Sequence, residues 1–245
     1  MTETILIVGG TRGVGRAMAL GAVAAGHRVV VVARGAEGLA ALKAEAPGVE
    51  TVQADAAADG VAAKLLAEHA PDRVVLVGGL KPHIAPISQH SWETFSAPWQ
   101  ADTKIAFEFT QAALKGGMKD GGTVVSFASG AALNGSPLSG GYAGAKRMQH
   151  LIGQYAQGEA NGRDLGLKFY TIYPKQLIEG TDIGAEASSA YGKATGKGAE
   201  GFMAQWEAPL TPEKIAGQVD MILADAETNT PGAYGLTGTG YEPMG

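Results

Sequence analysis

A tyrosine and a lysine four positions apart open a long helical stretch of the sequence. Tyr142 and Lys146 are separated by Ala-Gly-Ala, and positions i and i+4 share one helix face, about 6 Å apart along the axis. A phenol has an ordinary pKa of about 10, so it shuttles protons poorly at neutral pH. Lowering that pKa to 7 requires roughly 4 kcal/mol of phenolate stabilisation. We expect Lys146 to lower the pKa of Tyr142 and make it a general acid and base.

The Tyr-x-x-x-Lys spacing also occurs by chance on amphipathic helix faces, so it needs a third group. Ser129 lies thirteen residues before Tyr142 and follows the predicted strand Thr123–Phe127. A loop hydroxyl at that place would lie at the carboxyl edge of a sheet. Ser126 is a less favoured alternative because it falls within the strand. The sequence therefore predicts a catalytic group of Ser129, Tyr142 and Lys146.

A glycine-rich turn follows the first predicted strand, Ile5–Val8, and precedes a helical pattern. Its first glycine permits a tight turn, and the next two let the backbone approach a pyrophosphate and the helix pack on the strand. The helix N-terminus presents free N–H groups and a partial positive charge to the phosphates. Glycines alone could mark a plain turn, but the strand–turn–helix context predicts dinucleotide binding. The expected cofactor contacts in this turn are Gly9, Thr11, Arg12, Gly13, Val14 and Gly15.

The end of the second predicted strand, Val29–Ala33, indicates which nicotinamide is bound. NAD-binding folds place an acid there to accept hydrogen bonds from the ribose 2′-OH. Here Arg34 follows the strand, and the first acid is Glu37. A guanidinium can hold a 2′-phosphate through two hydrogen bonds, and Arg12 could reach the same group. We therefore expect NADP(H) as the cofactor.

The elements that must position these groups alternate between strands and helices. Most of the strands are continuously apolar, as expected for parallel strands covered on both faces. The pattern predicts an α/β fold in which a doubly wound, Rossmann-like parallel sheet carries helices on both faces, in a single domain over residues 1–245. The predicted strands are Ile5–Val8, Val29–Ala33, Thr51–Gln53, Val74–Val77, Thr123–Phe127, Phe169–Tyr173 and Ala233–Leu236. The predicted helices are Gly15–Ala25, Leu39–Ala46, Val61–Ala70, Trp99–Leu114, Tyr142–Glu159 and, capped by Thr211, Pro212–Ala224.

One long stretch, residues 176–209, shows no strand pattern and is rich in Gly, Ala and Ser. In a doubly wound fold it should project from the carboxyl ends of the strands, beside the cofactor, as a lid. An oligomer contact or a satellite core is the alternative interpretation. Four residues that could pack on a substrate or on one another are Tyr191, Phe202, Met203 and Trp206.

The G-x-x-x-G-x-G spacing, followed in order by Ser129, Tyr142 and Lys146, resembles the short-chain dehydrogenase/reductase family from about residue 4 to residue 240. The resemblance implies that Tyr142 is the acid in reduction and the base in oxidation. It implies that Ser129 polarises the substrate oxygen and that Lys146 also holds the nicotinamide ribose. Asp55 matches an adenine-contacting aspartate, with a solvated loop carboxylate as the alternative. Cofactor contacts implied outside the glycine turn are Arg34, Asp55, Ala56, Gly78, Gly79, Tyr142, Lys146 and Leu177.

Three departures from the family pattern bear on the proton relay. Asp102 stands where the family commonly has an asparagine, so it could support a relay through Lys146 or simply pair with it. Residues 76–79 read Leu-Val-Gly-Gly instead of Asn-Asn-Ala-Gly. Lys175 replaces the glycine after Pro174, which would leave Leu177 near the carboxamide, contacting it through its backbone.

Composition excludes several other classes. The net charge of −5 comes without a basic cluster, which argues against nucleic acid or an anionic membrane as the partner. Cysteine is absent and no histidine spacing indicates a metal site, so no metal is expected; His83 and His90 are interpreted as surface residues, with polar substrate contacts as the alternative. The N-terminal apolar run is too short for a signal or membrane segment, so we expect a soluble, cytoplasmic protein.

The predicted function is that of an NADP(H)-dependent oxidoreductase, which moves a hydride between nicotinamide and a carbonyl or secondary alcohol of a small organic substrate. Reduction is the expected direction, because NADPH is usually the reduced pool. A non-catalytic NADP(H)-binding sensor or scaffold of the same fold is the alternative, whereas a two-domain isomerase or dehydratase would need a further C-terminal domain. We expect a homodimer or homotetramer built on the helices Trp99–Leu114 and Tyr142–Glu159, whose apolar content exceeds one stripe.

Overall fold

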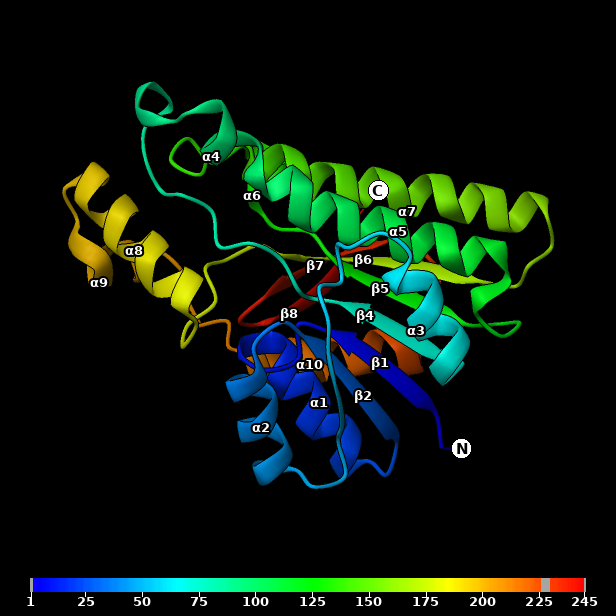
Figure 1. Cartoon of the computed structure of the whole chain (residues 1–245). Coiled ribbons are helices and arrows are strands. Elements are labelled where there is room, and N and C mark those ends of the chain that lie inside the picture. The colour runs from blue at the N-terminus through cyan, green and yellow to red at the C-terminus, as the bar shows by residue number, and fades with distance from the viewer. Residues whose placement is uncertain (1, 226–229, 245) are drawn as a thin grey trace.

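A twisted sheet runs through the centre of the molecule, in a computed structural model that describes residues 2–225 and 230–244 (Figure 1). Within these residues the strand order is β3-β2-β1-β4-β5-β6-β7-β8, and all neighbours are parallel except β7 and β8. The order reverses between β1 and β4, which creates a crevice at the carboxyl ends of these strands. The strands are β1 (Thr4–Val8), β2 (Arg28–Ala33), β3 (Glu50–Gln53), β4 (Arg73–Leu76), β5 (Thr123–Phe127), β6 (Lys168–Pro174), β7 (Ala233–Thr237) and β8 (Gly240–Met244).

Helices cover both faces of the sheet, as the sequence predicts (Figure 1). One face carries α1 (Gly13–Ala24), α2 (Ala36–Glu45) and α10 (Pro212–Ala224), and the other carries α3 (Val61–His69), α5 (Lys104–Ala112) and α7 (Tyr142–Gly162). Fully buried residues such as Leu42 and Ile215 fill the first layer, and Leu66 and Phe109 fill the second. The predicted doubly wound α/β fold is confirmed.

The predicted helix Trp99–Leu114 is in fact the middle of a longer, interrupted rod. It begins with α4 (Trp92–Pro98), passes through a π-helical turn at Trp99–Thr103, continues as α5 and ends in a second π-helical turn, Ala113–Gly117. Pro98 lies at the first junction and cannot donate a backbone hydrogen bond, which favours a local irregularity there. The first π-helical turn brings Asp102 into the protein interior.

Residues 176–209 contain no named strand but do contain two helices, α8 (Asp182–Thr195) and α9 (Gly198–Met203). These helices pack against each other beyond the carboxyl ends of the strands (Figure 1). Two further short segments border the same end of the sheet, the 3₁₀ turn Ile87–Gln89 and α6 (Ala131–Asn134). We call residues 176–209 the lid segment.

The antiparallel strand β8 does not follow from the sequence pattern. Its residues read Gly-Tyr-Glu-Pro-Met, and a proline argues against a strand except at a sheet edge. β8 lies at that edge, where Pro243 is opposite Tyr234. Lys175 Nζ contacts Glu242 Oε1 of β8 at 2.6 Å, so the lysine that departs from the family pattern ties β8 to the end of β6.

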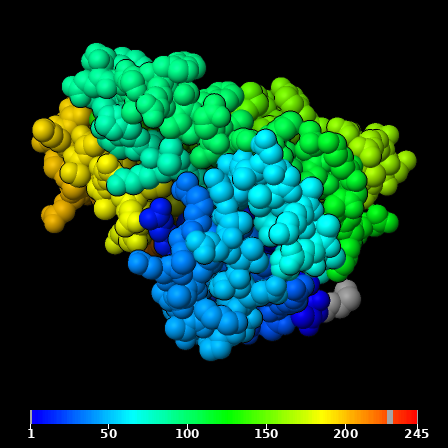
Figure 2. Space-filling view, in the orientation of Figure 1, coloured from blue at the N-terminus to red at the C-terminus, as the bar shows by residue number. Residues whose placement is uncertain are grey.

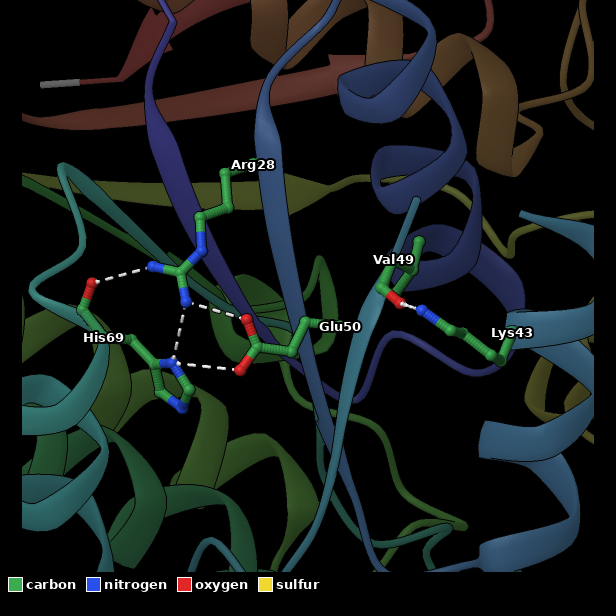
Figure 3. A network of polar contacts seen from close by, with 5 residues as sticks. All are labelled: Arg28, Lys43, Val49, Glu50 and His69. Atoms are coloured by element: carbon green, nitrogen blue, oxygen red, sulfur yellow. Dashed lines mark hydrogen bonds and ion pairs between the residues drawn. The ribbon is translucent and has the colours of Figure 1, made fainter. Parts of the chain in front are cut away.

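A polar network lies at the amino-terminal ends of β2 and β3, at the end of the sheet away from the crevice (Figure 3). The Arg28 guanidinium donates to Glu50 Oε2 at 2.7 Å and to the backbone oxygen of His69 at 3.3 Å. Nearby, Lys43 Nζ donates to the backbone oxygen of Val49 at 2.6 Å. Because Arg28 and Glu50 begin β2 and β3, this network stabilises the edge remote from the crevice. In the part of the chain that the structure describes, no helix is long and apolar enough to cross a membrane.

Candidate active site

The glycine turn has a backbone that only glycine can form at two of its positions. Gly9 has a φ of +87°, and a β-carbon there would lie 2.5 Å from the Cα of Gly78. A β-carbon at Gly15 would collide with the backbone oxygen of Gly9. These contacts bring the turn, the end of β4 and the first turn of α1 together without intervening side chains. The backbone can therefore approach a bound phosphate closely.

The N-terminus of α1 is available to an anion. Its N-cap residue, Arg12, forms no side-chain cap, and no acidic residue lies in the first turn. The first N–H groups and the positive end of the helix are thus left for a phosphate. This cradle fits the pyrophosphate of a dinucleotide, and Thr11 and Val14 belong to the same turn and helix start.

The two predicted 2′-phosphate residues differ in their surroundings. Arg12 is exposed and pairs with Asp182 of the lid segment at 3.1 Å. Arg34 is exposed at the end of β2, and within residues 2–225 and 230–244 no hydrogen bond or ion pair of its guanidinium is found. Asp55 is also exposed, and its carboxylate accepts the Ala57 N–H at 3.0 Å. This hydrogen bond shapes the local turn, so it gives Asp55 a structural role. The contact of Asp55 with adenine stays a prediction.

Ser129, Tyr142 and Lys146 come together at the carboxyl end of β5. Tyr142 is the first residue of α7, and Lys146 Nζ lies 5.6 Å from the centre of its ring. Ser129 lies close enough to Tyr142 to affect the pKa of its phenol, and the Ser129 Oγ accepts the Ala131 N–H at 3.2 Å. Ser126 instead points into the sheet, where it is buried and donates to the Tyr170 backbone oxygen at 3.4 Å. The geometry thus favours Ser129 over Ser126.

Asp102 pairs with the candidate catalytic lysine. Its Oδ2 lies 2.9 Å from Lys146 Nζ, and its Oδ1 accepts the Leu80 N–H at 2.7 Å. Lys146 Nζ also donates to the backbone oxygen of Phe127 at 3.0 Å. Both side chains are buried, with Asp102 only 1% exposed. Of the two roles considered for Asp102, the structure shows the ion pair.

Among the protein's own groups, Lys146 does not bring the pKa of Tyr142 below its ordinary value. Tyr142 is half-buried, and burial raises the pKa of its phenol; Lys146 opposes that rise, Asp102 adds to it, and Ser129 opposes it. The net pKa of Tyr142 lies above its ordinary value chiefly because of burial, and Asp102 adds to the rise by offsetting part of the charge of Lys146. Burial lowers the pKa of Lys146, but the nearby negative charge of Asp102 and Tyr142 outweighs it and raises that pKa. The phenol therefore stays protonated at neutral pH, which suits a proton donor.

Comparison with known proteins agrees with this arrangement. A family model described as short chain dehydrogenase matches residues 3–192, more than half of the chain. The protein belongs to the short-chain dehydrogenase family. No curated protein matches it in sequence.

Solved structures of short-chain dehydrogenases share the fold. A variant of actinorhodin polyketide ketoreductase with NADPH is 22% identical at a TM-score of 0.82, covering 97% of this chain and 96% of that chain. Levodione reductase is also 22% identical, with a TM-score of 0.82, and the match covers 96% of each chain. A short-chain dehydrogenase from Streptomyces avermitilis is 22% identical at 0.76, covering 98% of this chain and 90% of that one. At this identity the likeness establishes the fold.

The glycines after β4 show why small residues are kept there although the two asparagines expected of a short-chain dehydrogenase are absent. Gly78 backs onto Val8 and Gly9, and a β-carbon at Gly79 would lie 2.6 Å from Asp102 Oδ2. Small residues are therefore required both by the glycine turn and by the buried carboxylate. The sequence predicted Gly78 and Gly79 as cofactor contacts but gave no indication of their contact with Asp102.

The lid segment of this short-chain dehydrogenase touches three parts of the crevice rim. Asp182 pairs with Arg12, Glu186 pairs with Lys81 at 2.5 Å, and the Tyr191 hydroxyl accepts the Leu138 N–H at 3.2 Å. In Figure 2 the yellow surface of α8 borders the dark blue glycine turn and the blue-green segment after β4. Neither Lys81 nor the two acids was predicted from the sequence, because each pair joins segments about a hundred residues apart or more.

The aromatic residues of the lid segment pack mainly on one another. Tyr191 and Phe202 stack at 5.5 Å, and Phe202 meets Trp206 edge-on at 5.8 Å. Leu177 and Trp206 line a cavity of about 480 Å³ between α8, α9 and the chain that follows β6. The satellite-core interpretation therefore describes part of this segment, and Leu177 lies beside that small core.

The two histidines near the crevice have different surroundings. His83 is exposed. His90 is half-buried, and its ring nitrogens lie 3.1 Å from the Ala85 backbone oxygen and 3.2 Å from Thr94 Oγ1. Its ring holds the loop before α4 in place.

Proposed function

We propose that this short-chain dehydrogenase is an NADP(H)-dependent carbonyl reductase in which Tyr142 transfers the proton. The observation that carries the proposal is that Lys146 Nζ lies 2.9 Å from the Asp102 carboxylate and 5.6 Å from the centre of the Tyr142 ring, with Ser129 beside the same phenol. This group lies at the carboxyl edge of the sheet, beside a glycine turn that fits a dinucleotide. The site thus offers a proton donor and a second hydroxyl for a substrate oxygen, and a cation beside the donor.

The residues have distinct tasks in the proposed reduction. The hydroxyls of Ser129 and Tyr142 hold the carbonyl oxygen, and a nicotinamide bound at the glycine turn would supply the hydride to the carbonyl carbon. As charge develops on the oxygen, the Tyr142 O–H donates its proton and an alcohol forms. Lys146 stabilises the phenolate that is left until solvent returns a proton. In oxidation the same steps run backwards, with the phenolate as base.

The lid segment and the oligomer are further parts of the proposal. Three polar contacts hold the lid segment over the crevice, which supports a role in enclosing the substrate. Phe107 of α5 is 48% exposed and Tyr155 of α7 is 66% exposed, which supports an assembly through these helices. A homodimer or homotetramer would cover both rings.

A panel of ketones and aldehydes with NADPH tests the proposed function. We expect oxidation of NADPH that depends on the carbonyl compound and yields the matching alcohol. NADPH binding without turnover on any member of the panel would instead support a non-catalytic sensor or scaffold. Parallel assays with NADH establish which nicotinamide is used.

Replacement of Arg34 should weaken the use of NADPH selectively. Hydrogen bonds to charged groups contribute about 1.5–3 kcal/mol, so Arg34→Ala should lower kcat/KM for NADPH roughly 10- to 100-fold. The value with NADH should change little, because its ribose carries no 2′-phosphate. Steady-state kinetics with both cofactors measures the effect, and Arg163→Ala, at an exposed arginine just past the far end of α7, is the matched control. Equal losses with both cofactors would contradict the assigned role.

A further inference from the structure

Gln149 is a buried polar residue of α7 that the proposed reaction does not use. It lies one helical turn beyond Lys146 and is 1% exposed. Its Nε2 donates to the backbone oxygen of Asp102 at 3.1 Å. Among the described residues its Oε1 has no hydrogen-bond partner. A buried amide in this position must contribute more than packing, because an apolar side chain of similar size would avoid the cost of desolvation.

The segment that Gln149 contacts has an unusual backbone. Asp102 lies in the π-helical turn Trp99–Thr103, where the Lys104 N–H donates to the Trp99 oxygen, five residues back. π-helical turns are rare and often occur at functional sites, and surrounding contacts must hold them. Here α7 supplies two such contacts, from Gln149 to Asp102 and from Thr103 Oγ1 to the Ala145 oxygen at 3.4 Å.

The Asp102 carboxylate depends on that backbone for its position. Leu80 holds Oδ1 and Lys146 contacts Oδ2, so both oxygens are directed by where the turn places the side chain. The Asp102 backbone and side chain are thus contacted by two residues of the same helix, three positions apart. A shift of the turn would change the distance between Asp102 and Lys146.

We propose that Gln149 is a positioning residue of the active site, which anchors the π-helical turn and thereby fixes the Asp102 carboxylate against Lys146. The inference deepens the proposed function, but its geometric part does not require turnover. The charged groups that act on the Tyr142 phenol are Lys146 from α7 and Asp102 from the turn, and Ser129 adds a hydroxyl from the segment after β5. A substitution that lets the Asp102 carboxylate move should therefore change the pKa of Tyr142.

Titration of the Tyr142 phenol tests the proposal without substrate or cofactor. Incorporated fluorotyrosine, which is more acidic than tyrosine, brings ionisation into a pH range where the protein stays folded. Fluorine NMR then identifies the Tyr142 signal by its loss in Tyr142→Phe. Because Asp102 raises the pKa of Tyr142, Asp102→Asn should lower it. Gln149→Met should also lower the pKa of Tyr142, but by a smaller amount, roughly 0.5 to 1 pH unit.

A double-mutant cycle distinguishes positioning from a general effect on the helix. If Gln149 acts through the Asp102 charge, Gln149→Met should cause no further shift in the Asp102→Asn protein. Gln154→Met makes the same change at an exposed position of α7 and should leave the pKa unaltered. Gln149→Asn is the second variant if Gln149→Met does not fold. It keeps an amide, but its side chain is too short for the contact with Asp102, so the pKa of Tyr142 should fall in the same way.

Two results would overturn the proposal. One is an unchanged Tyr142 pKa in the folded Gln149 variants. The other is an equal shift with and without the Asp102 charge, which would show that Gln149 acts on the phenol by another route. Absence of turnover on every carbonyl compound would reject the proposed function but would leave this titration unaffected, so the two failures are distinguishable.

Discussion

Tyr142→Phe should lower kcat for carbonyl reduction by about 10³-fold while leaving NADPH binding nearly unchanged. A positioned general acid contributes typically about 10²–10⁴-fold, and phenylalanine keeps the ring while removing the proton. The glycine turn and Arg34, which are expected to bind the cofactor, do not depend on the phenol hydroxyl. Steady-state reduction rates and fluorescence titration with NADPH measure the two quantities separately.

A second tyrosine of the same helix provides the control for this result. Tyr155 is 66% exposed on α7, and Tyr155→Phe should retain the original rate. Equal reduction rates in the original protein and in Tyr142→Phe would reject Tyr142 as the proton donor. Loss of NADPH binding along with the rate would show instead that the hydroxyl is needed to form the cofactor site.

Lys146→Met should destabilise the folded protein strongly, because it leaves Asp102 buried without its cation. Breaking a buried ion pair by removing one partner typically costs about 3–5 kcal/mol. Adding Asp102→Asn should restore most of that stability, since asparagine carries no charge and can still accept the Leu80 N–H. Urea unfolding of the two single variants and the double variant measures the free energies.

An exposed ion pair serves as the reference for the lysine variant. Lys104 pairs with Asp59 at the surface, and Lys104→Met should cost far less than Lys146→Met. A Lys146→Met protein as stable as the original would mean that Asp102 is not held as a buried anion. The explanation of the raised Tyr142 pKa would then fail as well.

Local patterns were sufficient to select the candidate residues that the structure brings together. The glycine turn is recognisable because its spacing follows an apolar strand, and Arg34 because it ends the next one. Tyr142 and Lys146 are set four apart by the helix itself. Each of these predictions depends on a stretch of a few residues, and the structure brings all of them to one edge of the sheet.

The electrostatic balance of the site could not be predicted in the same way. The expected lowering of the Tyr142 pKa counted Lys146 and not its partner, because Asp102 comes from a helix forty residues earlier. The π-helical turn that buries Asp102 has no sequence signature beyond Pro98. The contact of Gln149 with the Asp102 backbone likewise depends on how two helices pack, and no pattern within α7 reveals it.

Hydride transfer itself can be followed with NADPH that is deuterated at both positions of nicotinamide C4. The account predicts that a carbonyl compound accepted by the protein becomes an alcohol with deuterium on the former carbonyl carbon, as detected by mass spectrometry and NMR. It also predicts that Tyr142→Phe forms this product only in trace amounts. Oxidation of the cofactor without deuterium in the alcohol, or full yield of labelled alcohol from Tyr142→Phe, would contradict it.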